Sequence, residues 1–336
     1  MGGLTAVRRR HHGGTDHSSF NSFTSEPDCS SRLTAEAVPA NPPSRHHYIP
    51  IFYSQWWAVD GVVQRYTNPY KRVISVRRCA PSEVGWERDL YASPDPKARQ
   101  HLEQRAFGPL DNSAARALVK LNARPVVELT ESDTLAWSLF IMSLLNRTPE
   151  AMAAGLEAGE RIWRRTAPRA REKFLAEGGD GAEEAVAAYV SSLTPDEPTR
   201  AFLRILPGVI ANPKINTFIA NMQWVAIDLP EGCPDLLLSD DPLARTNGIA
   251  KPGGHLALPL SPRRLMIAAW DQDTLGHFRQ QPAKETAKEL NRWVVESARR
   301  FVVARDRSQT RFIQNRFGRN PKAAIARAIG HKDPLR

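Results

Sequence analysis

The hydrophobic pattern of this chain changes its period twice, and this change constrains the fold more than any other feature of the sequence. Residues 62–66 and 73–77 are β-branched, alternating runs separated by the turn-forming segment 67–70, a pattern typical of a β-hairpin. From about residue 82 apolar side chains recur at helical spacing instead. The expected helices cover residues 96–107, 112–123, 131–147, 149–177, 181–193, 196–211 and 213–222.

Short apolar segments bounded by proline and glycine return after Trp224, and they predict strands at residues 224–229, 236–238, 256–260 and 265–269. A long amphipathic helix over residues 283–305 follows them. We therefore expect an α+β fold that is predominantly helical. The N-terminal hairpin and the late strands would form one small mixed sheet, and the helical middle, about residues 82–222, would form a lobe of its own.

Two helix starts carry recognisable capping residues. Thr130 with Asp133 three residues later resembles a capping box, and Thr148 before Pro149 places a proline at the first helical position. Both signals support the boundaries predicted for the two longest helices of the middle lobe.

Composition divides the chain into three parts. Residues 1–44 are polar and rich in glycine, serine and proline, which predicts a disordered leader, and residues 45–305 would form a single globular domain. Residues 306–336 form a basic C-terminal tail that either contacts the phosphate backbone of a nucleic acid or is simply solvated. The basic residues of this tail are Arg307, Arg311, Arg316, Arg319, Lys322, Arg327, Lys332 and Arg336.

Charge and cysteine content indicate where the chain works and what it meets. The net charge of +10 would attract nucleic acids or other phosphate-bearing ligands, although an arginine-rich composition from a GC-rich genome gives the same charge. The 3 cysteines share no short spacing, which favours a reducing, cytoplasmic compartment. The longest apolar segment, residues 135–145, is shorter than the roughly 20 residues of a membrane span, so no membrane partner is expected.

Several motifs recur here in the order in which an uncharacterised bacterial family has them. They are the segments His47-Tyr48-Ile49-Pro50 with Phe52-Tyr53, Ser239-Asp240-Asp241-Pro242 and Pro259-Leu260-Ser261-Pro262, together with Glu103, Arg147-Thr148-Pro149, Trp224 and Leu290-Asn291. The chain resembles the domain-of-unknown-function family numbered 4238 over about residues 46–305, with Asp241 standing where the family usually has asparagine. The resemblance implies positions that matter and brings no activity with it.

Three of these positions suit catalysis by their side-chain chemistry. His47 can act as a base, a ligand or a phosphate contact, or it can be a core histidine bonded to the backbone. Glu103 can be a catalytic acid beside Arg147 as an anion-binding residue, or the two can form an internal ion pair. Asp111 is expected to cap a helix, and Asn291 to reach the same interior.

The paired carboxylates Asp240 and Asp241 follow a predicted strand, and such a pair can hold a divalent metal ion. The alternative is a turn in which aspartate accepts backbone N–H groups before Pro242. Asp240 is the stronger candidate of the two, because the resemblance places an uncharged asparagine at the position of Asp241.

If His47, Glu103, Arg147 and Asp240 converge, they would supply the base, carboxylates and positive charge that phosphoester hydrolysis requires, with a divalent metal as a possible cofactor. The best functional hypothesis is therefore a hydrolase acting on a phosphoester or nucleic acid. The alternative is a non-enzymatic binding or regulatory module whose basic tail contacts nucleic acid. The sequence has no Walker loop, GxGxxG, HExxH or GxSxG motif, so nucleotide-dependent, zinc-protease and ordinary serine-hydrolase classes lack support.

Overall fold

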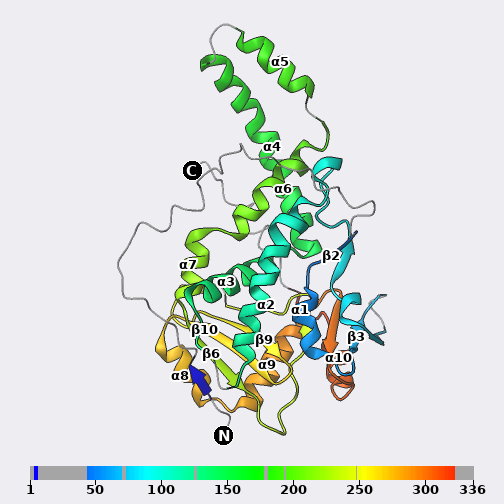
Figure 1. Ribbon diagram of the computed structural model, residues 1–336, viewed down its shortest axis with the longest axis vertical. Coiled ribbons are helices and arrows are strands. Elements are labelled where there is room, and N and C mark those ends of the chain that lie inside the picture. The colour runs from blue at the N-terminus through cyan, green and yellow to red at the C-terminus, as the bar shows by residue number, and fades with distance from the viewer. Residues whose placement is uncertain are drawn as a thin grey trace, which may run out of the picture.

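The computed structural model describes residues 4–6, 44–69, 73–124, 127–177, 181–192, 194–246 and 248–321. Most of the predicted leader and residues 322–336 of the predicted basic tail lie outside these residues. The fold is α+β and predominantly helical, as the sequence predicts (Figure 1).

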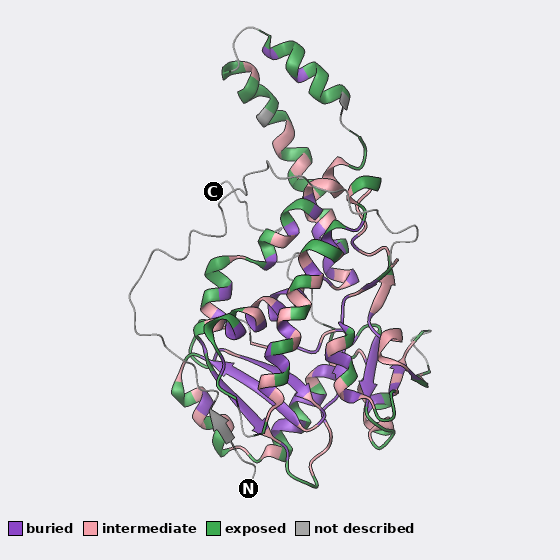
Figure 2. Cartoon of the chain, in the orientation of Figure 1, coloured by how far each residue is buried: buried purple, intermediate pink, exposed green. Residues whose placement is uncertain are grey.

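The middle of the chain is helical from residue 96 to residue 221. The short 3-10 helix η4 (Pro96–Ala98) and the π-helix η5 (Leu102–Phe107) precede α2 (Gly108–Asn122), α3 (Glu131–Asn146), α4 (Pro149–Glu177), α5 (Ala182–Ser192), α6 (Glu197–Ile210) and α7 (Pro213–Asn221). The far half of α4 and α5 project away from the rest of the fold and are mostly exposed (Figures 1 and 2). The expected helices are therefore confirmed, with the first one split into two short segments.

Both predicted capping signals operate at the starts of helices. The Thr130 hydroxyl accepts the Asp133 backbone N–H at 3.2 Å, and the Asp133 carboxylate accepts the Thr130 N–H at 2.8 Å. The Thr148 hydroxyl accepts the Ala151 N–H at 3.2 Å at the start of α4. These bonds satisfy backbone donors that a helix leaves free in its first turn.

The strands form three sheets, so the expectation of one sheet shared by the hairpin and all the late strands is wrong in this detail. The five-stranded sheet has the order β1-β6-β10-β9-β8, from Leu4–Ala6, Gln223–Asp228, Arg264–Ala269, His255–Ser261 and Ala244–Arg245. The four-stranded sheet has the order β4-β3-β11-β7, from Ser75–Cys79, Val63–Thr67, Phe301–Ala304 and Leu238–Ser239. The third sheet pairs β2 (Arg45–His47) with β5 (Trp86–Arg88).

Strands β6, β9 and β10 of the five-stranded sheet are buried on both faces, which explains why they read as continuous apolar runs. On β10, Leu265 and Ile267 face one hydrophobic cluster together with Leu290 and Val294 of α9 (Ala283–Ser297). The intervening Met266 faces the other cluster, which contains the aromatic side chains of α3. The core therefore has two parts, separated by this sheet.

Helix α9 ends at Ser297, earlier than the predicted residue 305, because the next apolar residues form strand β11. Val302 and Val303 are β-branched and fully buried between β3 and β7. Strand β11 pairs antiparallel with β3. The predicted hairpin is confirmed: β3 pairs antiparallel with β4, from Val63 opposite Cys79 to Thr67 opposite Ser75.

Five further helices of the described residues lie between or beyond these strands. They are α1 (Ile51–Ser54) with the 3-10 helix η2 (Gln55–Trp57), the 3-10 helix η3 (Pro81–Glu83), α8 (Gln272–Gln280) and α10 (Thr310–Arg316). Helix α10 continues the fold into the predicted tail, since Ile313 is buried and Phe317 is 9% exposed against the α9 side of the core. Within the described part of the chain, no helix is long and apolar enough to cross a membrane.

Candidate active site

The segment from His47 to Pro50 is held in place by the β5 side of the fold. The backbone N–H groups of Tyr48 and Ile49 donate to the Gly85 carbonyl at 2.8 and 3.1 Å. Gly85 has a φ of +63°, and a Cβ there would lie 2.5 Å from the Ile49 Cβ. Only glycine fits this close approach in the left-handed conformation, so Gly85 fixes where His47 and Tyr48 lie.

His47 has one ring nitrogen committed and one available. Its Nε2 lies 3.1 Å from the Ser82 carbonyl, which can only accept, so Nε2 carries the proton in the neutral ring and Nδ1 keeps its lone pair. Burial lowers the pKa of His47, and the positive charge of Arg147 contributes to the same direction. His47 is therefore a neutral base at pH 7. The neighbouring His46 is bonded through both nitrogens, to Gln100 at 2.7 Å and to the Tyr91 N–H at 3.0 Å.

Arg147 lies at the centre of the candidate site. It follows the last residue of α3, and its side chain is 0% exposed. Its Nη1 donates to both carboxylate oxygens of Asp111, at 2.9 and 3.1 Å, and its guanidinium lies over the rings of Phe107 and Phe140. Its Nε and Nη2 have no hydrogen-bond partner. A buried guanidinium with two unused donor nitrogens has the donors that an oxyanion requires.

Glu103 lies on the π-helix η5, close enough to Arg147 for the two charges to affect each other. Burial raises the pKa of Glu103 to about 7, Arg147 opposes this rise, and Asp111 adds to it. Its Oε2 is buried and has no hydrogen-bond partner, and the same holds for the nearby Tyr91 hydroxyl. A π-helical turn bearing a half-protonated carboxyl is typical of functional sites.

The charge of Arg147 therefore affects the pKa of both His47 and Glu103, whereas Asp240 affects neither. A shared catalytic role for the four residues stays a prediction. The expected ion pair differs in one partner, because Arg147 bonds to Asp111 and leaves Glu103 without a bonded cation. Asp111 does not cap α2, since that helix continues directly from η5 and Asp111 lies in its first turn.

Asp240 occupies a neighbouring network. Its carboxylate is buried and accepts the backbone N–H groups of Arg299, Arg300 and Phe301 at 3.1 to 3.3 Å. Burial raises its pKa to about 7, although these three donors favour the charged form. By accepting these three N–H groups, Asp240 fixes the backbone between the end of α9 and the start of β11. In the segment His47-Tyr48-Ile49-Pro50, Asp240 affects the pKa of Tyr48 and not that of His47. Burial and the negative charge of Asp240 both raise the pKa of Tyr48.

Asp241 points to a different partner from Asp240. Its carboxylate accepts from Arg245 Nη1 at 3.2 Å, and its backbone N–H donates to the Ser239 hydroxyl at 3.2 Å. Among the described residues, no group of three or more histidine, cysteine, aspartate or glutamate side chains is arranged to hold a metal ion. A metal-binding role for Asp240 and Asp241 stays a prediction.

Arg300, whose backbone N–H donates to Asp240, also forms a salt-bridge network at the surface. Arg300 donates to Glu150 at 2.8 Å and to Glu87 at 2.9 Å, and the charges of all three residues affect the pKa of Tyr48. The pKa of Tyr91 is affected in turn by both Tyr48 and Arg147. Tyr48 is therefore coupled electrostatically to Asp240 and, through Tyr91, to Arg147.

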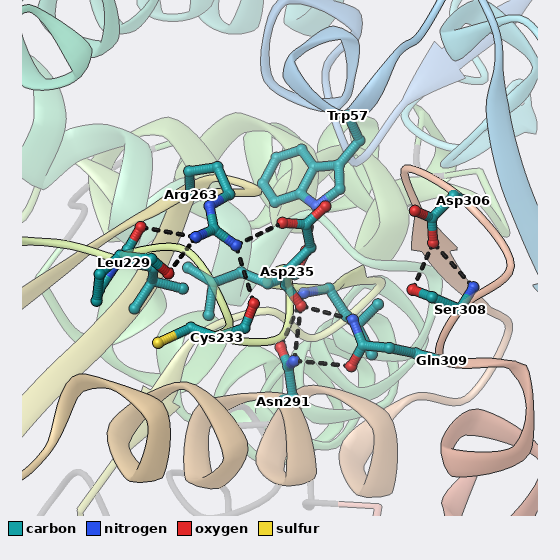
Figure 3. A network of polar contacts seen from close by, with 12 residues as sticks. Trp57, Leu229, Cys233, Asp235, Arg263, Asn291, Asp306, Ser308 and Gln309 are labelled. Carbon is teal, nitrogen blue, oxygen red and sulfur yellow. Dashed lines mark hydrogen bonds and ion pairs between the residues drawn. The ribbon is translucent and has the colours of Figure 1, made fainter.

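Asn291 belongs to a separate network on the α9 side of the molecule (Figure 3). Its Oδ1 accepts the Leu237 N–H at 2.8 Å, and its Nδ2 donates to the Asp235 carbonyl at 2.8 Å and to Gln309 at 3.1 Å. Arg263 closes the network from the other side, with its Nη1 3.0 Å from the Asp235 carboxylate. Asn291 thus fixes the segment that leads into β7 and does not reach Arg147.

The described part of the basic tail is partly neutralised. Arg316 donates to Glu296 at 2.9 Å and lies over the Phe312 ring, and Arg307 donates to Gln64 at 3.3 Å. The nucleic-acid contact predicted for this tail stays a prediction.

Comparison with known sequences gives the chain a family. The sequence model described as Protein of unknown function (DUF4238) matches residues 45–308. The chain belongs to this family. The DUF4238 match begins at the first residue of β2 and ends just before α10, so it contains the whole candidate site. No curated protein and no solved structure matches the chain.

Three residues of the site were not predicted from the sequence. Tyr48 lies inside the motif His47-Tyr48-Ile49-Pro50, and the sequence could have identified it as a site residue, because the hydroxyl of a buried tyrosine needs a hydrogen-bond partner. Asp111 carried a signal too, since an acid in the first turn of a helix can serve a partner elsewhere. Tyr91 had no signal, because it lies in an irregular segment between β5 and η4.

Proposed function

We propose that this chain is a phosphoester hydrolase in which Glu103 is the general acid, His47 the general base and Arg147 the positive charge that stabilises the phosphoryl oxygens. The observation that carries the proposal is the pKa of about 7 for Glu103 beside a fully buried arginine with two unused donor nitrogens. An acid that is half protonated near neutral pH is well suited to give a proton to a leaving group. The adjacent guanidinium suits phosphate geometry.

In the proposed reaction, water attacks the phosphorus atom and the bond from phosphorus to the leaving oxygen breaks. His47 Nδ1 accepts a proton from the attacking water, and Glu103 gives its proton to the leaving oxygen. The products are an alcohol and a phosphate, and solvent returns the proton from His47 to Glu103. Negative charge on the phosphoryl oxygens is stabilised by Arg147, in an interior where such an interaction is stronger than in water.

A divalent metal ion, predicted at Asp240 and Asp241, is a separate part of the hypothesis. The three backbone donors on Asp240 support an architectural role for that carboxylate. Metal binding is tested by thermal unfolding with Mg²⁺, Mn²⁺ or Zn²⁺. A metal-dependent rise in melting temperature that Asp240→Asn removes would support the metal role, and no rise in the wild type would contradict it.

The proposed activity is tested with p-nitrophenyl phosphate and bis-p-nitrophenyl phosphate at pH 6.5, in EDTA and with each metal. We expect Glu103→Gln and His47→Gln each to lower kcat by about 100-fold or more, the usual range for loss of a general acid or base. Matched controls are Glu157→Gln, an exposed glutamate paired with Arg161 on α4, and His277→Gln, an exposed histidine on α8. Both should retain wild-type turnover.

Two results would contradict the proposal. One is a folded wild-type protein that hydrolyses neither ester under any of these conditions, which would favour the non-enzymatic binding module. The other is turnover that survives Glu103→Gln at the rate of the Glu157→Gln control.

A further inference from the structure

A cleft lies beside the candidate site, between the η4–η5 segment and α6. Its volume is about 390 Å³, within the range of small-molecule sites. Its apolar surface includes Tyr91, Leu102 and Leu203, and its polar surface includes Arg105 and Arg200. An apolar floor with cationic groups around it fits a ligand that is part apolar and part anionic.

The positive charge of this cleft is not cancelled by its own acidic residues. The Asp95 carboxylate accepts the Lys97 N–H at 2.9 Å as the cap of η4, and Arg204 bonds to Glu197 at 2.7 Å. Arg105 and Arg200, by contrast, have no acidic partner within the described chain. Arg200 Nε is buried and without a hydrogen-bond partner. Two arginines thus remain available to a phosphate group.

Tyr91 connects this cleft to the proposed catalytic residues. Its side chain lines the cleft, is 1% exposed, and has a hydroxyl without a partner. Its ring centroid is 4.7 Å from that of Phe107, over which the Arg147 guanidinium lies. Leu102 of the cleft directly precedes Glu103 on the π-helix η5. A ligand in the cleft would therefore be separated from Glu103 and Arg147 by little more than one aromatic ring.

We propose that this cleft binds a nucleotide, with the base on the apolar floor and phosphate oxygens on Arg105 and Arg200. The inference goes beyond the proposed function, because it assigns a ligand to a cleft next to Glu103 and Arg147 and does not require those residues to be catalytic. The polar side chains Ser93 and Asp95 at the cleft suit the hydrogen-bonding edge of a heteroaromatic base better than an alkyl chain. Leu102 and Leu203 offer such a base an apolar surface to pack against.

The test is isothermal titration of the full chain with AMP, adenosine and inorganic phosphate in separate experiments. We expect AMP to bind at least tenfold more tightly than either fragment, since the base and the phosphate have separate contacts. Arg105→Gln and Arg200→Gln should each weaken AMP binding by about tenfold or more, the usual effect of losing a charge-assisted hydrogen bond. The matched control is Arg161→Gln, an exposed arginine of α4 that should bind AMP like the wild type.

Two outcomes would overturn the inference. AMP that binds no more tightly than phosphate would show that no base is recognised, and equal affinities in Arg105→Gln, Arg200→Gln and Arg161→Gln would place the nucleotide elsewhere.

Failure of this inference can be distinguished from failure of the proposed function. Glu103→Gln should bind AMP with wild-type affinity, so binding by a protein that hydrolyses no ester supports the cleft and refutes the catalytic proposal. Hydrolysis of p-nitrophenyl phosphate by a protein that binds no AMP has the opposite meaning: it retains the catalytic proposal and overturns the nucleotide.

Discussion

Replacing Glu103 by glutamine should stabilise the protein at alkaline pH and leave its stability unchanged at acidic pH. The pKa of Glu103 is raised in the folded state, so the folded state binds this proton more tightly than the unfolded chain does. The free energy of unfolding therefore falls as the pH rises from the ordinary value of 4.5 to about 7, and the penalty is complete above that range. Glutamine has a similar shape and no charge, so it avoids the penalty.

The size of the effect follows from the pKa shift. A rise from 4.5 to about 7 corresponds to roughly 3 kcal/mol at about 1.4 kcal/mol per pKa unit. Glu103 is only partly buried, and water screens the charge, so we expect about 1–2 kcal/mol. The free energy of unfolding of Glu103→Gln should therefore be about 1–2 kcal/mol higher than that of the wild type at pH 8, with no difference at pH 4.

Urea unfolding at pH 4 and pH 8, followed by circular dichroism, measures this difference. The control is Glu157→Gln, whose exposed ion pair with Arg161 contributes less than about 1 kcal/mol and has no raised pKa to relieve. The reasoning is refuted if Glu103→Gln is less stable than the wild type at pH 8, because Glu103 would then be a stabilising partner of Arg147. A gain of equal size at both pH values would also refute it.

Three further predictions concern the residues that position the site. Asp240→Ala should cost about 2–4 kcal/mol, because it leaves three buried backbone N–H groups without an acceptor; urea unfolding at pH 4, close to the ordinary pKa of an aspartate and well below its pKa of about 7 in the fold, so that almost no charge penalty is relieved, measures this, and a loss below 0.5 kcal/mol, about the effect of an ordinary surface change, would count against it. Gly85→Ala should lower the free energy of unfolding by about 2–3 kcal/mol and slow p-nitrophenyl phosphate hydrolysis, because the φ of Gly85 is +63° and the new Cβ would clash with Ile49. The control Gly276→Ala in α8 has open space around the new Cβ and should not destabilise the protein, so equal stabilities of the two variants would contradict this prediction. Asn291→Ala should cost about 2–3 kcal/mol by leaving the Leu237 N–H unpaired while p-nitrophenyl phosphate turnover per folded molecule is retained; a selective loss of turnover would show that Asn291 does reach the site.

The local structure of this chain could be predicted where one segment determines its own conformation. The helical periods, the two caps and the β3–β4 hairpin depend on residues that are close in sequence, and all of these predictions are confirmed. The end of α9 could not be predicted in this way. It depends on Asp240, which lies some 60 residues earlier in the chain and accepts the backbone N–H groups after the helix.

In the candidate site, the identities of the residues could be predicted from the sequence, but their bonding partners could not. Residue type and resemblance pointed to His47, Glu103 and Arg147, and the charge of Arg147 affects the pKa of the other two. The partner of Arg147 was not predictable, because Glu103 and Asp111 are both acids at the same end of the helical lobe and only packing decides between them. The carboxylate of Asp240 is also buried, but its oxygens accept hydrogen bonds from backbone N–H groups, and no sequence pattern predicts these bonds.

The pH dependence of phosphoester hydrolysis tests the central claim most directly. Catalysis requires neutral His47, whose pKa is lowered below 6.5, and protonated Glu103, whose pKa is about 7, so kcat should rise through the first pKa and fall as the pH rises through about 7. In Glu103→Gln the descending limb should disappear together with most of the activity. A wild-type rate that stays constant or rises up to pH 9, or a Glu103→Gln profile identical to that of the wild type, would show that Glu103 is not the acid.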